Sequence, residues 1–166
     1  RIDGIAAPDE WNRAVMTQVN DGVAATSFYA LADSQTVYLR VDAKTAWKTF
    51  GDITVGAYFD SPRLKERSAG SHFNSNLNLN STTLAEVLLI QGGGYFGAVY
   101  QVENDSWKPI ETLQAIGVQG NVLEFSMPLK NLGGVVAGDE VKFIFLISKD
   151  EREVQRSEVR VLMIGK

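Results

Sequence analysis

Apolar and polar side chains alternate along most of this chain, and no segment keeps the period of an amphipathic helix. Val37, Leu39 and Val41, for example, alternate with tyrosine, arginine and aspartate. Residues 141–148 are apolar at almost every position, which is typical of a strand buried on both faces. The pattern predicts about nine strands, at residues 14–19, 24–31, 37–41, 53–60, 84–91, 95–102, 122–127, 141–148 and 158–164.

Clusters of glycine, asparagine and aspartate separate these runs, as at Asn20-Asp21-Gly22 and Gly92-Gly93-Gly94. Many short strands joined by frequent turns predict an all-β fold, an antiparallel two-sheet β-sandwich of the immunoglobulin or jelly-roll type. Short helical turns are expected at 8–13 and 129–132. The 166 residues contain no linker-like stretch, so we expect a single domain, 1–166, excised from a larger secreted protein.

Composition narrows the classes of partner. The chain has no cysteine, which excludes disulfides and thiol chemistry. Its formal net charge is -4, whereas nucleic-acid binders usually present a basic face, so neither nucleic acid nor an anionic membrane surface is expected as a partner. No apolar run approaches the roughly 20 residues of a spanning helix, so membrane insertion is not expected either.

The segment 61–83 is long, polar and poorly patterned until its second half, where Asn74, Asn76, Asn78 and Asn80 alternate with other residues. In an extended strand this spacing places the four amides on one face. Such a strip is suited to hydrogen bonding with the hydroxyl groups of a ligand. The interpretation that we favour is a solvated hairpin edge, where amides oppose sheet-to-sheet association.

Four motifs occur in a recognisable order. Ile2-Asp3-Gly4 precedes Glu10-Trp11, and Asp33 precedes Tyr38-Leu39-Arg40-Val41. A strand bounded by Asp52 and Asp60 follows, and then Leu123-Glu124-Phe125-Ser126-Met127-Pro128-Leu129. This order resembles the DOMON-like modules, which include family-nine carbohydrate-binding modules and the C-terminal domains of some glucodextranases and pullulanases.

The resemblance implies a sandwich of two antiparallel sheets, sometimes with a structural calcium ion. In family-nine modules two tryptophans clamp a terminal sugar, helped by charged and amide side chains. Trp47 lies just before the strand that begins near Asp52, which is similar to the place of one clamp tryptophan. The chain departs from the family pattern near its C-terminus, where residues 148–154 contain no second tryptophan.

Sugar binding requires flat apolar rings and planar hydrogen-bonding groups, because a ring matches the C–H face of a pyranose. The candidate ligand-binding residues are Trp47, Arg40, Tyr58, Asn76 and Asn78. Two of them have alternative roles, since Trp47 could instead cover the edge of the core and Arg40 could form a surface ion pair. Calcium prefers oxygen ligands, and the candidates for a structural calcium site are Asp3, Asp33 and Asp60.

No pattern indicates catalysis. His72 is the only histidine, and nothing in the sequence fixes a triad around it or supplies the several ligands of a zinc site. The expected function is that of a non-catalytic carbohydrate-binding module in a secreted or cell-surface, glycan-processing bacterial protein. It would bind a polysaccharide or oligosaccharide and contact other domains of its parent chain. The alternative is a structural spacer, which predicts a buried Trp47 and an exposed apolar patch.

Overall fold

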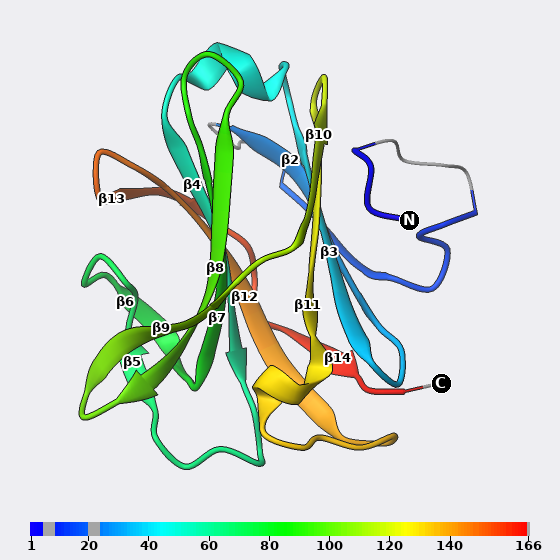
Figure 1. The fold of residues 1–166 in the computed structure, drawn as a ribbon, viewed down its shortest axis with the longest axis vertical. Coiled ribbons are helices and arrows are strands. Elements are labelled where there is room, and N and C mark those ends of the chain that lie inside the picture. The colour runs from blue at the N-terminus through cyan, green and yellow to red at the C-terminus, as the bar shows by residue number, and fades with distance from the viewer. Residues whose placement is uncertain (5–8, 20–23, 166) are drawn as a thin grey trace.

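The computed structural model describes residues 1–4, 9–19 and 24–165. In this part of the chain, two antiparallel sheets pack against each other (Figure 1). The predicted all-β sandwich is therefore confirmed. No helix in the described part of the chain has the length and apolar character needed to span a membrane.

The first sheet has five strands in the order β1-β2-β3-β11-β10. Leu39 of its central strand lies opposite Ala30 on one side and Phe125 on the other, and all three side chains are fully buried. Alternation of buried and half-buried residues along β3 shows that one face of this sheet meets the core, as the sequence pattern predicts. The strands are β1 (Val15–Gln18), β2 (Ala25–Ala32), β3 (Thr36–Ala43), β10 (Ala115–Gln119) and β11 (Val122–Pro128).

The second sheet has seven strands in the order β13-β12-β4-β7-β8-β9, and β14 also pairs with β12. These strands are β4 (Ile53–Asp60), β7 (Thr83–Leu89), β8 (Tyr95–Glu103), β9 (Ser106–Thr112), β12 (Glu140–Lys149), β13 (Arg152–Arg156) and β14 (Arg160–Met163). Two short 3-10 helices, η1 (Trp47–Phe50) and η2 (Leu129–Leu132), lie in the connections. The predicted helical turn at 129–132 is thus confirmed.

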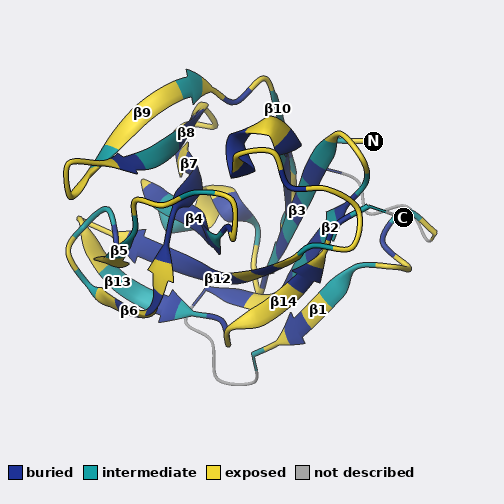
Figure 2. Ribbon diagram, turned by 90° about the horizontal axis from the view of Figure 1, so that it is seen from below, coloured by how far each residue is buried: buried dark blue, intermediate teal, exposed yellow. Residues whose placement is uncertain are grey.

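The main core fills the space between the two sheets (Figure 2). Its large aromatic members include Phe28 and Phe145, whose rings stack with centroids 5.0 Å apart. Burial of each such side chain contributes on the order of 2 kcal/mol to folding. The two sheets therefore hold each other mainly through apolar contact, and the buried Gln155 side chain of β13 adds hydrogen bonds to the main chain of Ala25 in β2.

A second, smaller core lies on the outer face of the seven-stranded sheet. The hairpin of β5 (Ser68–Gly70) and β6 (Asn76–Ser81) folds over this face and buries Leu77 and Leu79 against Tyr58, Leu84 and the two apolar β12 residues Ile144 and Leu146. This cover explains why β12 is buried on both faces. It also leaves the remainder of the outer face open.

Fourteen strands are present in the described residues, so the prediction of about nine was too low. The strands that it omitted are β5, β6, β9, β10 and β13. Most of them are edge strands or parts of the small hairpin, where exposed polar side chains obscure the apolar alternation. The helical turn expected at 8–13 falls partly outside the described residues, and 9–13 form turns.

Candidate functional site

An open groove of about 470 Å³ lies on the uncovered part of the outer face of the seven-stranded sheet. We call it the outer groove. Its volume is within the usual range of small-ligand sites. The residues that line it are Asp52, Ile53, Thr54, Phe73, Glu86, Leu88, Phe96, Ala98, Tyr100, Ser148, Asp150 and Glu151.

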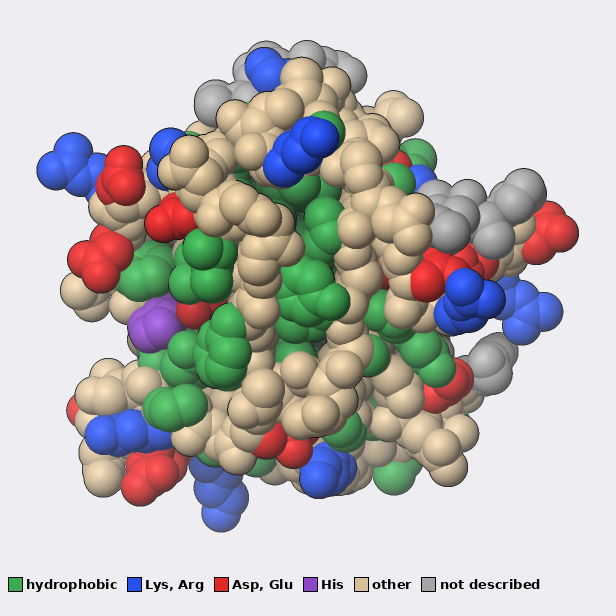
Figure 3. Space-filling view, turned by 45° about the horizontal axis from the view of Figure 1, so that its top comes forward, with side chains coloured by type: hydrophobic (Ala, Val, Ile, Leu, Met, Phe, Trp, Pro, Cys, Tyr) green, Lys and Arg blue, Asp and Glu red, His purple; other side chains and the backbone are tan. Residues whose placement is uncertain are grey.

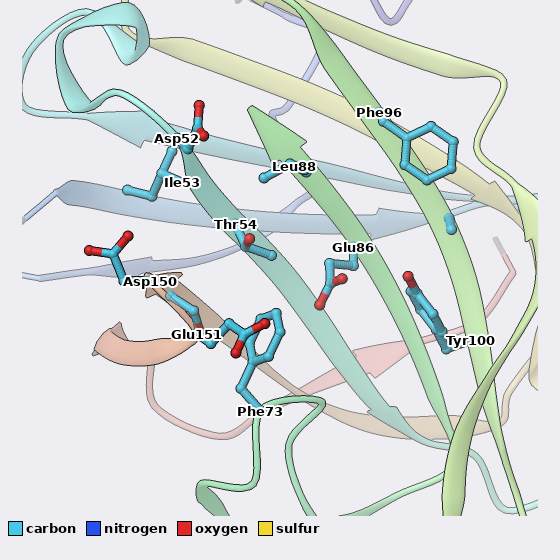
Figure 4. Close-up of a pocket in the computed structure, with 12 residues that line it drawn as sticks. Asp52, Ile53, Thr54, Phe73, Glu86, Leu88, Phe96, Tyr100, Asp150 and Glu151 are labelled. Atoms are coloured by element: carbon cyan, nitrogen blue, oxygen red, sulfur yellow. The ribbon is translucent and has the colours of Figure 1, made fainter. Parts of the chain in front are cut away.

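The floor of the outer groove is made by alternate residues of three adjacent strands. Thr54 of β4, Glu86 and Leu88 of β7, and Phe96 and Tyr100 of β8 all point away from the main core, because side chains two apart share a face. Phe96 is 52% exposed, and Tyr100 is half-buried. Two aromatic rings therefore lie on one open surface, as Figure 4 shows.

The walls come from two tight turns. The β5–β6 turn contributes Phe73, whose ring lies at one end of the groove (Figure 4). The β12–β13 turn contributes Asp150 and Glu151, which have φ values of 53° and 60°. Two successive positive φ values are the signature of a type I′ hairpin turn, and this turn fixes both carboxylates at the side of the groove.

Glu86 is held by the only histidine of the chain. The Nδ1 atom of His72 lies 3.1 Å from both carboxylate oxygens of Glu86. A carboxylate only accepts hydrogen bonds, so Nδ1 carries the proton and donates. This hydrogen bond raises the pKa of the His72 imidazole, and the opposing effect of partial burial is smaller.

The same histidine docks the small hairpin onto the sheet. Its main-chain N–H donates to the buried Tyr58 hydroxyl over 2.9 Å, and its ring contacts Phe73 and Tyr100 with centroids 4.9 and 4.6 Å away. Burial raises the pKa of the Tyr58 phenol, which therefore stays protonated. Figure 3 shows hydrophobic side chains gathered around the histidine, with acidic side chains beside them.

The groove is acidic. Its four charged lining residues are Asp52, Glu86, Asp150 and Glu151, and no lysine or arginine lines it among the described residues. The adjacent Lys149 directs its ammonium group to the main-chain carbonyls of Phe50 and Asp52. Burial raises the pKa of Tyr100, and the neighbouring charge of Glu86 adds to that effect.

The residues predicted to bind a ligand do not come together. Trp47 is only 1% exposed and packs against Phe50, so its ring is not an open platform in this structure. Tyr58 is buried beneath the small hairpin. Arg40 belongs to the five-stranded sheet, where it pairs with Asp42 at 2.6 Å and stacks 4.2 Å from the Tyr29 ring centroid.

Asn76 and Asn78 are exposed on β6, as the alternation predicts, but neither lines the outer groove. Asn76 instead accepts hydrogen bonds within the hairpin region. Its side-chain oxygen accepts from the Asn78 N–H at 2.9 Å, and its carbonyl accepts from Arg156 at 2.7 Å. These contacts agree with the structural alternative for the asparagine strip.

The three candidate calcium ligands each have another role. Asp3 pairs with Arg1 at 2.6 Å, and Asp60 pairs with Arg67. Burial alone would raise the pKa of Asp33, but the hydrogen bonds that its carboxylate accepts from the N–H groups of Gln35 and Thr36 and from the Tyr38 hydroxyl together outweigh burial and lower the pKa. Within the described residues, no group of three or more acidic, histidine or cysteine side chains is arranged to hold a metal ion.

The outer groove was missed at the level of sequence, although a signal was present. Glu86 is the one charged residue in the apolar run 84–90, and Phe96 and Tyr100 share the outward phase of the next strand. A carboxylate and two aromatic rings on neighbouring outward positions indicate a surface that can bind a ligand.

Comparison of this chain with protein-family models, with curated proteins and with solved structures finds no match.

Proposed function

We propose that this domain is a non-catalytic carbohydrate-binding module of a secreted or cell-surface, glycan-processing protein, and that the glycan lies in the outer groove. The observation that carries the proposal is the exposed Phe96 ring and the half-buried Tyr100 ring beside the Glu86 carboxylate. Apolar rings match the C–H faces of sugars, and a carboxylate accepts hydrogen bonds from their hydroxyl groups.

The form of the groove also supports a glycan. It is open, and the β5–β6 and β12–β13 turns bring Phe73 and Glu151 next to each other at one end (Figure 4), so a segment of a chain-like ligand has room to enter and leave along the rest of its edge. Its floor belongs to three hydrogen-bonded strands, which hold the rings and the carboxylate rigidly. A rigid floor reduces the entropy that binding must offset.

The experiment is isothermal titration calorimetry with a panel of soluble oligosaccharides, comparing the wild type with Phe96→Ala. Loss of a stacked ring is expected to weaken binding about tenfold, which is a typical effect of one aromatic contact. The matched control is Ile110→Ala, since Ile110 is 44% exposed on β9 and lies outside the groove. If no glycan of the panel gives a heat of binding with the wild type, the proposal is refuted.

The alternative function, a structural spacer, is favoured by two observations of its own. Trp47 is buried, and Leu88, Ile90 and Phe96 form an exposed apolar strip on the outward side of the β7–β8 hairpin. Such a strip is typical of a surface that contacts a neighbouring domain. Ile90→Lys places a charge in this strip. If the variant domain then melts independently of the rest of its parent protein, and if no glycan binds to the wild type, the spacer function is the better explanation.

A further inference from the structure

We infer that the outer groove selects glycans that carry protonated amino groups, such as chains of glucosamine units, an inference that rests on the proposed carbohydrate-binding function. Three features of the groove support it. They are a nearly buried carboxylate with one donor, aromatic rings around that carboxylate, and the sign of the charge on the walls.

The buried carboxylate is that of Glu86, which is 9% exposed. His72 is its only hydrogen-bond donor among the described residues. An ionised carboxylate has about four acceptor positions. Because buried polar groups are normally satisfied, the free positions of Glu86 favour a ligand rich in N–H and O–H donors.

The rings of Phe73, Phe96 and Tyr100 surround this carboxylate on the groove surface (Figure 4). Aromatic faces attract cations through the negative charge of their π-electrons. A protonated amine on a sugar ring is thereby favoured twice, by the faces of the rings and by Glu86. A hydroxyl group at the same position of the sugar can also donate a hydrogen bond to Glu86, but it carries no charge and therefore gains neither the ion pair nor the cation–π attraction.

The charges of the walls add to this preference. Asp52, Asp150 and Glu151 form no close ion pair in the described part of the chain, and His72, when protonated, supplies one positive charge against the four carboxylates of the groove. The groove therefore keeps a negative charge. It repels glycans with carboxylate or sulfate groups and attracts cationic ones, because complementary charge gives specificity at partly exposed sites.

The test uses three six-unit, β-1,4-linked oligosaccharides that differ only at C2 of each sugar: a hydroxyl in cellohexaose, an acetamide in the N-acetylglucosamine hexamer, and an amine in the glucosamine hexamer. Calorimetry at mildly acidic pH keeps the sugar amines protonated. We expect the glucosamine hexamer to bind roughly tenfold more tightly than cellohexaose, which is the scale of a partly desolvated cation–π contact. Added salt is expected to reduce this difference.

Two double variants separate groove charge from overall charge. Asp150→Asn with Glu151→Gln removes two of the four carboxylates of the groove and is expected to reduce the ratio of the glucosamine-hexamer affinity to the cellohexaose affinity severalfold. Glu103→Gln with Glu140→Gln removes two exposed charges outside the groove and should leave the preference intact. Equal losses in the two double variants would overturn the inference.

The remaining outcomes are distinct. If cellohexaose and the glucosamine hexamer bind equally, the inference fails and the proposed function stands. If none of the three oligosaccharides binds, the proposed function loses its support as well. If hexalysine binds as tightly as the glucosamine hexamer, charge alone drives binding, and selection of an amine-bearing glycan is refuted.

Discussion

The indole N–H of Trp11 donates to the Oε1 atom of Glu124 over 3.1 Å, across 113 residues of sequence. The Oε2 atom of the same carboxylate accepts the main-chain N–H groups of Asp3 and Gly4, each at 3.0 Å. Glu124 is fully buried on β11. One carboxylate therefore joins the N-terminal segment to the outer face of the five-stranded sheet, opposite in the fold to the outer groove.

We expect Glu124→Ala to lower the free energy of unfolding by about 3 kcal/mol, because three N–H donors lose a charged acceptor together. Urea denaturation followed by circular dichroism measures the change. Glu103→Ala is the matched control, since Glu103 is exposed, and its effect should stay within about 0.5 kcal/mol. A loss for Glu124→Ala as small as that of the control would show that the segment is not held by this carboxylate.

Gly117 of β10, which pairs with Glu124 of β11, also lies against the N-terminal segment. A Cβ atom at this position would lie 2.5 Å from the carbonyl carbon of Asp3, so the N-terminal segment would have to move. We expect Gly117→Ala to destabilise the protein by about 1–3 kcal/mol, the usual effect of overpacking. At Gly94 a Cβ would make only ordinary contact, at 3.8 Å from Ile90. Gly94→Ala should therefore leave the urea midpoint nearly unchanged, and equal effects at the two positions would contradict the prediction.

Much of the fold follows from period-two alternation. Val37, Leu39 and Val41 are all fully buried, as their spacing predicts. The pattern fails where a strand has no buried face of its own. In β9, for example, most side chains are exposed, and Pro109 removes a hydrogen-bond donor, so the segment lacks the sequence signature of a strand although it pairs with β8.

The outer groove could not be assembled from the sequence, because it is defined by what the small hairpin leaves uncovered. Period two assigns Glu86 and Tyr100 to outward positions but cannot show that they are neighbours of Phe73. Trp47 illustrates the opposite difficulty. Its polar neighbours Lys48 and Thr49 are exposed, as a loop predicts, but the turn of η1 directs the indole ring into the core, where Phe50 packs beside it.

Leu77 links the stability of the hairpin to the shape of the groove. It is fully buried beneath β6, whereas Asn80 on the same strand is exposed. We expect Leu77→Ala to reduce the free energy of unfolding by about 3 kcal/mol, as for other large-to-small core changes. It should also weaken glycan binding without touching the glycan, because the hairpin carries Phe73. Asn80→Ala serves as the control. Unchanged glycan binding in Leu77→Ala would show that the packing of the hairpin does not determine the shape of the groove.

The pair of His72 and Glu86 predicts a pH dependence with a definite sign. Its hydrogen bond raises the folded-state pKa of His72 above the ordinary value of 6.5. A raised pKa means that the stabilisation is fully present below 6.5 and is lost as the pH rises through the folded-state value. The groups that act on His72 besides Glu86 are the carboxylate of Glu151 and the neighbouring rings of Phe73 and Tyr100.

Because His72 is the only histidine, its ring protons can be followed in a proton NMR titration without assignment. We expect a midpoint above 6.5 in the wild type and a lower midpoint in Glu86→Gln, since the neutral amide supports the imidazolium less strongly than a carboxylate does. Glu103→Gln removes an exposed charge on the same sheet and should leave the midpoint nearly unchanged. The difference in melting temperature between the wild type and His72→Gln should be largest in acid and should become smaller as the pH rises above the midpoint. A midpoint at or below 6.5 that Glu86→Gln does not move would show that the two side chains are not coupled in solution.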